Sequence, residues 1–253
     1  MLSENRISYI KNALYTEKKV SISDISERLN ISYPTVRKYF NIVAQNDPNI
    51  KKVYGGLEMS EDANKLITYS KRLIKNGEQK KEIATKALKF ITERSTILMD
   101  SSTTTYELAC LMVKLDFQFT VITNGISTAR LLSQNDKITT IVLPGILHKD
   151  SNTIIDDFNF DFASHFNIDQ YIFSASGLSL DSGFSEYNLQ EVSNKRNNVK
   201  KAKQCIALID SSKFCNPSSA NFAKLEDVDI LITDSKIDKK IYNLYKERVQ
   251  IIC

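Results

Sequence analysis

Apolar residues recur at helical spacing in three successive segments of the first sixty residues. Each stripe has about one apolar residue per turn, which is typical of helices that bury one face. The stripes are Ile7, Ile10 and Leu14, then Ile22, Ile25 and Leu29, then Val36, Phe40 and Val43. The pattern predicts three short helices around a shared core.

The connection between the second and third stripes predicts a sharp turn. Asn30 is suited to the left-handed conformation that ends a helix, and Ser32 is suited to capping the next one. Pro34 falls in the first turn of that helix, where a missing N–H costs nothing. Ser21, with Asp24 three residues later, is an approximate capping box for the preceding helix. The segment therefore predicts a helix-turn-helix.

The polar face of the third predicted helix suits the major groove of a DNA duplex. Two glycines after a basic stretch predict a tight hairpin, which we interpret as a wing beside the groove, with positive φ allowed at both glycines. The expected DNA contacts are Ser32, Tyr33, Thr35, Arg37, Lys38 and Asn41 on the helix and Lys52, Tyr54, Gly55 and Gly56 on the wing. A protein-interaction module is the alternative for such a small helical domain.

Charge favours nucleic acid as the partner. Residues 1–58 contain nine Lys or Arg against six Asp or Glu, whereas the remaining residues contain 25 against 24. The basic excess therefore lies in the segment that would contact DNA.

Beyond residue 78 the pattern changes to short apolar runs separated by helix-length segments. The runs are at 96–100, 119–123, 138–144, 170–175, 205–210 and 229–234. Apolar runs without alternation predict strands covered on both faces, and intervening helices predict a mainly parallel α/β sheet. We therefore expect a winged-helix domain at 1–59, a linker helix at 60–78 and an α/β domain at 79–253.

The remaining composition narrows the classes of protein. The chain is 42% hydrophobic and 25% charged, and it has no run of eighteen apolar residues and no signal-peptide pattern at its start. We expect a cytoplasmic protein with no membrane partner. The cysteines at 110, 205, 215 and 253 share no C-x-x-C spacing, and His148 and His165 are the two histidines. We expect reduced thiols, no metal and no cofactor.

Polar residues collect where the predicted strands end. The run Asp100 to Thr105 leads from a strand into a helix, so its hydroxyl and N–H groups would face an anion such as phosphate. Similar groups follow other strands, at Thr123-Asn124-Gly125, Asp210 to Lys213 and Thr233-Asp234. Carboxyl ends of parallel strands share one edge of a sheet, so one site could gather these runs. Hydroxyl clusters that only cap helices are the alternative.

Nearly the whole chain resembles the DeoR family of transcriptional regulators. The resemblance is carried in order by Arg6, ISYPTVRKYF, KVYGGL, KKEIATKAL, LMDSSTTTYELA, VITNG, LPG, GFSEYNLQEVSNK, DSSKF and LITD. Lys52 and Tyr54 stand at the arginine and histidine of the family's wing. Tyr39 replaces an acidic residue of its recognition helix, and Ser102 replaces a frequent glycine.

The resemblance implies a transcriptional repressor of a carbohydrate-metabolism operon, controlled by a phosphorylated sugar that binds a fold similar to ribose-5-phosphate isomerase and the CoA transferases. Its implied effector-binding residues are Asp100, Ser101, Ser102, Thr103, Thr104, Thr105, Asn124, Gly145, Glu186, Lys195 and Lys213. Glu191 and Lys195 have i, i+4 spacing, so an exposed ion pair is the alternative for them.

Two other functions remain open from the sequence. An enzyme acting on a sugar phosphate, an isomerase or transferase, could use Glu186, Asp100 and Lys213 to move protons. A sensor-like domain without a ligand would instead serve protein interaction. Because one winged helix contacts few base pairs, the regulator is expected to be a homo-oligomer, a dimer or tetramer, on double-stranded operator DNA.

Overall fold

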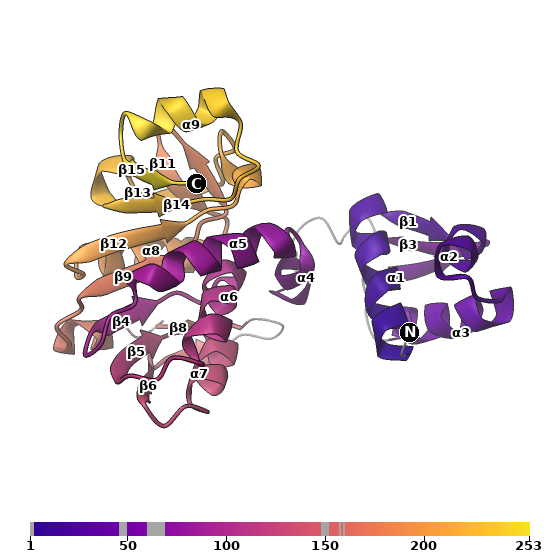
Figure 1. Ribbon diagram of the computed structural model, residues 1–253, viewed down its shortest axis with the longest axis horizontal. Helices are drawn as coiled ribbons and strands as arrows, with labels where there is room; N and C mark the ends of the chain where they lie inside the picture. Colours follow the sequence, from indigo (N-terminus) through magenta and orange to yellow (C-terminus); the bar gives the residue numbers. More distant parts are fainter. Residues whose placement is uncertain (1–2, 46–49, 60–68, 148–151, 157, 159) are drawn as a thin grey trace. The chain divides into compact units, whose positions relative to one another are not determined.

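The computed structural model describes residues 3–45, 50–59, 69–147, 152–156, 158 and 160–253 (Figure 1). The chain divides into two compact units, Met1–Lys75 and Asn76–Cys253. No helix within the described ranges is long and apolar enough to cross a membrane.

The first unit is a winged helix. Its elements are α1 (Ser3–Glu17), β1 (Lys19–Ser21), α2 (Ile22–Leu29), α3 (Tyr33–Gln45), β2 (Ile50–Val53) and β3 (Gly56–Met59), followed by α4 (Tyr69–Ile74). The three strands form an antiparallel sheet in the order β1-β3-β2. The three helices and the hairpin predicted from the sequence are confirmed.

The apolar stripes of the three helices meet in one core. Ile10, Leu14, Ile25, Val36 and Val43 are each 0% exposed. Asn30 adopts the left-handed conformation at φ 50° and ψ 54°, as expected, and the Ser21 hydroxyl accepts a hydrogen bond from the Asp24 N–H. These local signals end α2 and start the turn that orients α3.

The hairpin turn differs from the prediction of positive φ at both glycines. Val53 pairs with Gly56, so the two-residue loop is Tyr54-Gly55, and of the two glycines Gly55 is the one at positive φ, +77°. Gly56 is needed for another reason: a Cβ there would lie 2.3 Å from the Val20 carbonyl oxygen of the neighbouring strand.

The second unit contains a seven-stranded sheet in which all neighbouring strands are parallel. The strand order is β15-β14-β12-β9-β4-β5-β6. In chain order the strands are β4 (Thr96–Met99), β5 (Phe119–Thr123), β6 (Ile138–Val142), β9 (Gln170–Phe173), β12 (Gln204–Leu208), β14 (Ile230–Ile232) and β15 (Gln250–Ile252). The six predicted apolar runs coincide with the first six strands to within a residue or two at their ends, and β15 was not predicted.

Both faces of this sheet are covered, which explains the unbroken apolar runs. One face packs against α5 (Gly77–Ala87), η2 (Leu88–Phe90), α6 (Thr103–Met112) and α7 (Ile126–Leu132). The other packs against η3 (Phe162–His165), α8 (Leu189–Val199), η5 (Leu225–Asp227), α9 (Lys239–Lys246) and the antiparallel sheet β10 (Gly177–Ser179), β11 (Gly183–Glu186) and β13 (Ala220–Ala223). Successive side chains alternate between the two cores: Ile97 and Met99 face one, and Leu98 faces the other.

Three short elements follow strands of the large sheet. The strands β7 (Ile146–Leu147) and β8 (Ile154–Ile155) pair antiparallel after β6, and η4 (Ser211–Lys213) follows β12. Of the predicted linker helix at 60–78, residues 60–68 lie outside the described residues. Beyond them, α4 ends at Ile74 and α5 begins at Gly77, with Asn76 in the left-handed conformation between them.

Candidate functional site

The third helix presents an unengaged polar face. The side chains of Arg37, Lys38 and Asn41 are exposed, and no hydrogen bond or ion pair to another described residue holds them. Tyr33 is 51% exposed at the start of the helix. These groups are therefore available to an external partner, as basic and amide side chains that contact DNA must be.

Other members of the expected DNA-binding set have distinct surroundings. The Ser32 and Thr35 hydroxyls share a hydrogen bond of 2.9 Å at the first turn of α3. Tyr39, next to the basic pair, is 8% exposed, and its hydroxyl accepts a hydrogen bond from Arg6 Nη1 at 3.4 Å. The substitution at Tyr39 therefore lies in the core and not on the exposed face of α3.

The wing exposes its basic and aromatic side chains. Lys52 is exposed on β2, and Tyr54 at the tip of the hairpin is fully exposed. Both side chains are therefore accessible to a partner. Gly55 provides the positive φ of the turn, and Gly56 allows β3 to pass close to β1, as described above.

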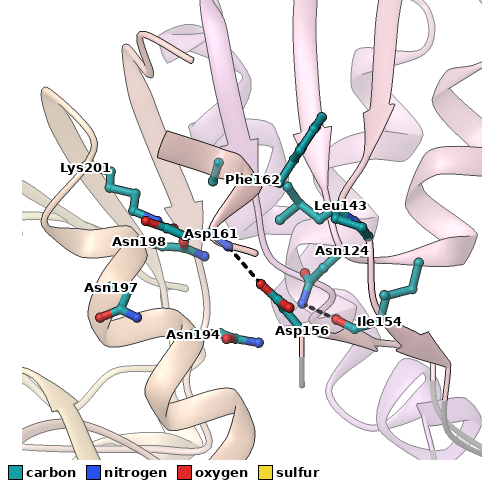
Figure 2. A pocket seen from close by; sticks show the side chains of 12 residues that line it. Asn124, Leu143, Ile154, Asp156, Asp161, Phe162, Asn194, Asn197, Asn198 and Lys201 are labelled. Carbon is teal, nitrogen blue, oxygen red and sulfur yellow. Dashed lines mark hydrogen bonds and ion pairs between the residues drawn. The ribbon is translucent and has the colours of Figure 1, made fainter. Parts of the chain in front are cut away.

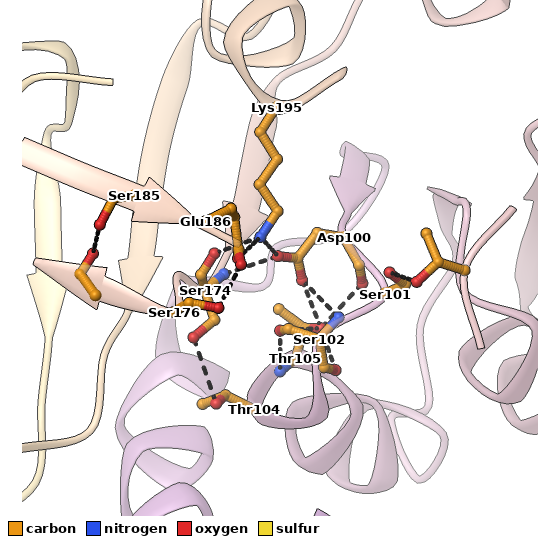
Figure 3. Close-up of polar contacts among 12 residues, drawn as sticks. Asp100, Ser101, Ser102, Thr104, Thr105, Ser174, Ser176, Ser185, Glu186 and Lys195 are labelled. Atoms are coloured by element: carbon orange, nitrogen blue, oxygen red, sulfur yellow. Dashed lines mark hydrogen bonds and ion pairs between the residues drawn. The ribbon is translucent and has the colours of Figure 1, made fainter. Parts of the chain in front are cut away.

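In the second unit, Asp100 is the centre of a buried polar network at the end of β4 (Figure 3). One of its carboxylate oxygens accepts the Ser102 N–H at 3.0 Å and the Thr105 hydroxyl at 2.9 Å. The other accepts the Ser174 N–H at 2.9 Å and lies 3.0 Å from Lys195 Nζ. Four donors thus engage Asp100, and these contacts hold the loop in shape.

Lys195 is the buried cation of this network. Its Nζ donates to Glu186 at 2.6 Å and to the Ser174 carbonyl at 2.7 Å, and it pairs with Asp100. The side chain is 7% exposed. The alternative of an exposed Glu191–Lys195 ion pair is therefore wrong for Lys195. Since an ammonium has three N–H groups, all three are engaged.

Asp100 and Lys195 shift each other's pKa. Burial raises the pKa of Asp100, but the Lys195 ammonium and the N–H groups of Ser174 and Ser102 lower it by more, so the pKa lies below its usual value. Burial lowers the pKa of Lys195, and Glu186 and Asp100 outweigh burial and raise it. The second carboxylate oxygen of Glu186 accepts the Ser176 hydroxyl. At neutral pH Asp100 is therefore a carboxylate and Lys195 an ammonium.

The hydroxyl run after Asp100 is mostly turned inward. Ser101 shares a hydrogen bond of 2.6 Å with Thr153, and Thr104 lies 3.5 Å from the Ser174 hydroxyl. Ser102 caps α6 by accepting the Thr105 N–H, and it is half-buried. Thr103, Thr104 and Thr105 are 6%, 1% and 0% exposed. Within this run, Ser102 is the most accessible side chain.

Lys213 joins the end of β12 to this network. Its Nζ donates to the Ser174 hydroxyl at 3.1 Å and lies 3.8 Å from Asp210. Burial raises the pKa of Asp210, but Lys213 and the hydrogen bonds from Ser212 and Asn76 lower it by more, so it lies below its usual value. The Lys213 side chain is 21% exposed, which makes it a more accessible cation than Lys195.

Asn124 and Gly145 are not hydrogen-bonded to the Asp100 network. Asn124 Nδ2 donates to the Ile154 carbonyl at 3.2 Å, and Asn124 lines a cavity of about 170 Å³ between β5, β8 and α8 (Figure 2). Gly145 does not line this cavity. It has φ +147°, and a Cβ there would lie 2.2 Å from the Ile155 carbonyl oxygen, so its role is in the backbone.

Sequence reasoning missed Ser174, which links Asp100, Lys195 and Lys213. The signal was available, because Ser174 directly follows β9 as Asp100 follows β4, and the two strands are neighbours. Thr153 was also missed. It precedes β8 and pairs with Gly125 in an isolated bridge, a contact that no sequence pattern predicts.

The structure offers no metal site among the residues it describes. No three His, Cys, Asp or Glu side chains within the described ranges are grouped as metal ligands would be. All four cysteines are free thiols. Burial raises the pKa of Cys205 to about 12, which keeps that thiol protonated and unreactive.

Comparison with known domain families gives two matches. Residues 6–63 match the DeoR-like helix-turn-helix domain, and residues 75–235 match the DeoR C terminal sensor domain.

Several curated proteins are similar over most of their length. The HTH-type transcriptional regulator GolR of Listeria innocua is 30% identical over 98% of this chain and 96% of its own. The HTH-type transcriptional repressor GlcR of Bacillus subtilis is 29% identical over 92% of this chain and 89% of its own. The glycerol-3-phosphate regulon repressor of Escherichia coli is 26% identical over 85% of this chain and 84% of its own.

Solved structures with a similar fold are more distant. Ribose 5 phosphate isomerase A from Neisseria gonorrhoeae has a TM-score of 0.40 and 15% identity over 53% of this chain and 52% of that one. The translation initiation factor eIF-2B from Pyrococcus horikoshii OT3 has a TM-score of 0.46 and 13% identity over 90% of this chain and 86% of that one.

Proposed function

This chain belongs to the DeoR family of transcriptional regulators, and from that membership we propose that it is a repressor of a carbohydrate-metabolism operon, released from its operator by a phosphorylated sugar. The observation that carries the proposal is the union of two units in one chain. One presents an unengaged basic helix face, and the other is a sensor domain with polar strand ends.

The DNA half of the proposal assigns contacts to α3 and the wing. Arg37, Lys38 and Asn41 would contact base edges or phosphates in the major groove, with Lys52 and Tyr54 beside it. One such domain covers few base pairs, so we propose that a homodimer or tetramer binds repeated half-sites in the cytoplasm.

The effector half places the phosphate at Ser102 and Lys213. Lys213 is the partly exposed cation at the shared strand ends, and Ser102 is the accessible hydroxyl of the α6 cap. Cations and hydroxyl groups near a helix N-terminus favour a phosphate ester. Asp100, Glu186 and Lys195 would hold this surface in place from below rather than contact the ligand.

Control of operator binding follows from linkage. If the sugar phosphate prefers the arrangement that does not bind DNA, a coupling free energy of about 1–3 kcal/mol changes operator affinity roughly 5- to 150-fold. The chain is similar in sequence to a protein named glycerol-3-phosphate regulon repressor, and this similarity supports a phosphorylated effector.

The enzyme alternative has less support. A general base needs an oxygen that is free to take a proton from the substrate. Asp100 is engaged by four donors, and both carboxylate oxygens of Glu186 accept hydrogen bonds, from Lys195 and Ser176. We therefore propose that the chain is not an enzyme.

The test uses the purified full chain and a labelled duplex from the region upstream of its own gene. Fluorescence anisotropy at about 0.15 M salt is expected to show binding at least 10³-fold tighter than to a shuffled duplex. Addition of pentose and hexose phosphates, one at a time, should release the operator with one compound. Equal affinity for both duplexes would contradict the DNA half, and release by none of the phosphates would contradict the effector half.

A further inference from the structure

The α8 helix lines a cavity beside the Asp100 network. While Lys195 points into the network, Asn194, Asn197, Asn198 and Lys201 line the cavity of about 170 Å³ shown in Figure 2. Asn124 lines it from the end of β5. We call this space the carboxamide cavity.

The size of the carboxamide cavity restricts its occupant. A cavity of about 150 Å³ in a protein interior holds one benzene molecule. A volume of about 170 Å³ therefore suits a single six-membered ring or a short chain of similar size.

The polar lining is rich in side-chain amides. Asn194, Asn197 and Asn198 follow i, i+3 and i+4 spacing, which places them on one helix face. No hydrogen bond to a described residue engages the amides of Asn194 and Asn197. Each amide offers two N–H donors and an acceptor oxygen, the combination that a hydroxyl group satisfies in both of its roles.

The charged lining disfavours a phosphate. Lys201, the cation of the cavity, forms an ion pair with Asp161. Burial lowers the pKa of Lys201, and Asp156 opposes that shift. Asp156 accepts the N–H groups of Phe158 and Asp161 at 3.1 Å each. Among the lining residues that the structure describes, Asp156 and Asp161 stand against a single ammonium, so these residues carry net negative charge, which attracts hydroxyl donors and repels anions.

The rest of the wall is apolar. Leu143, Pro144, Ile154 and Phe162 also line the cavity. A sugar ring has C–H faces that pack on apolar side chains and edges of hydroxyl groups that hydrogen-bond to amides. The cavity lining offers both apolar side chains and amides.

We propose that the carboxamide cavity binds a neutral, polyhydroxylated group of single-ring size, a sugar or an alditol. The inference deepens the proposed function, because the same chain would then distinguish sugars by their hydroxyl groups and not by phosphate alone. Asn124 precedes Gly125, and a Cβ on Gly125 would lie 3.1 Å from the Ser101 Cα, so the cavity adjoins the proposed phosphate loop. The group is therefore either the sugar part of the phosphorylated effector or a separate unphosphorylated sugar.

Isothermal titration calorimetry on the full chain tests the proposal. The probes are D-glucose, D-fructose, D-ribose and D-glucitol, the monophosphate of each, and inorganic phosphate. Asn194→Leu removes the amide at similar volume, Lys213→Met removes the proposed phosphate cation, and Asn243→Leu on exposed α9 is the matched control. Asn197→Ala, at an exposed position, repeats the test if Asn194→Leu reduces the folded fraction in circular dichroism.

Two results would support the cavity assignment. Binding of a parent sugar that Asn194→Leu weakens roughly tenfold or more, and that Lys213→Met leaves unchanged, identifies a separate neutral ligand. Binding of a monophosphate that both substitutions weaken identifies the sugar part of the effector. In either case the affinity for inorganic phosphate should be unchanged by Asn194→Leu. Asn243→Leu should bind every probe with the affinity of the unsubstituted chain.

Two results would overturn it. If a monophosphate binds with equal affinity to the unsubstituted chain, Asn194→Leu and Asn197→Ala, while Lys213→Met weakens it, the proposed function stands and the cavity assignment is wrong. If no sugar, alditol or monophosphate binds, both the cavity assignment and the effector half of the proposed function are wrong.

Discussion

Burial distinguishes two lysines of the sensor unit, Lys195 and Lys213. The helical spacing of Lys195 suggests a surface lysine, yet its side chain is 7% exposed and lies between Asp100 and Glu186. Its charge there is required by two buried carboxylates. Lys213, at 21% exposure, keeps the accessibility that a ligand contact needs.

Replacing Lys195 should therefore destabilise the protein strongly. Lys195→Met leaves the carboxylates of Asp100 and Glu186 buried without their cation, and the expected loss is about 3–5 kcal/mol in the free energy of unfolding. Urea unfolding followed by circular dichroism measures it. The matched control is Lys203→Met, which removes an exposed ion pair of 2.8 Å to Asp169 and should cost less than about 1 kcal/mol. Equal losses in the two variants would contradict the network's role.

The depressed pKa of Asp100 predicts a pH dependence of stability. Because the folded pKa lies below the unfolded value of about 4, the unfolded state binds the proton more readily as pH falls. The contribution of Asp100 is complete above about pH 5 and is lost as pH falls below about 4 toward the folded pKa. Urea unfolding between pH 3 and 6 should show a smaller slope of stability against pH in Asp100→Asn than in the unsubstituted chain. Parallel slopes would show that Asp100 is not the titrating group.

Arg37 should govern operator affinity. Its exposed guanidinium has no partner among the described residues, and Arg37→Ala is expected to cost about 1–3 kcal/mol of specific binding if the side chain contacts a base. The side chain could contact a base or a phosphate. Anisotropy with operator and shuffled duplexes distinguishes these two roles, because loss of a phosphate contact lowers the affinity for both duplexes equally. Arg248→Ala, on an exposed arginine of the sensor unit, is the control and should change neither.

At the scale of elements, backbone approach decides where glycine is required. In the wing, Gly55 takes positive φ in open space, whereas Gly56 sits where β3 passes close to β1. Sequence alone treats the two as one turn pair. The structure assigns the turn to the first and the strand packing to the second.

This difference predicts opposite outcomes for substitutions at neighbouring positions. Gly56→Ala places a Cβ 2.3 Å from the Val20 carbonyl oxygen, so the winged helix should lose about 1–3 kcal/mol of stability. Gly55→Asn should be nearly neutral, since asparagine tolerates the left-handed region and nothing lies within 4 Å. Thermal unfolding measures the stability of both variants, and fluorescence anisotropy at 20 °C measures their operator binding. A larger loss for Gly55→Asn would contradict the assignment.

At the scale of the whole molecule, the two units are expected to act through one coupling free energy. Linkage is reciprocal, so the factor by which the effector lowers operator affinity must equal the factor by which operator lowers effector affinity. We expect both factors to lie between about 5 and 150. Anisotropy gives the first factor and calorimetry of the operator-bound chain gives the second. Unequal factors would indicate a further state, such as a change of oligomer.

The sequence by itself determined the helix-turn-helix with its hairpin and six strands of the parallel sheet, in their order along the chain. Helical stripes such as Val36, Phe40 and Val43, the left-handed Asn30 and the Ser21 cap act within a few residues, and the apolar runs predicted six of the seven parallel strands. The resemblance carried by its ordered motifs led to the family. Local signals of this kind depend on propensity and periodicity, which sequence records directly.

Only the tertiary structure decided which polar residues meet and which remain accessible. Helical spacing suggested a Glu191–Lys195 pair, but packing of α8 over the sheet turned Lys195 toward Asp100 and Glu186. The same packing joined Ser174 to the network and set Asn194 beside a cavity. Such contacts join residues that are distant in the sequence, as Asp100 and Lys195 are, 95 positions apart. Burial and long-range proximity arise from the folded arrangement of layers, so no local pattern could reveal them.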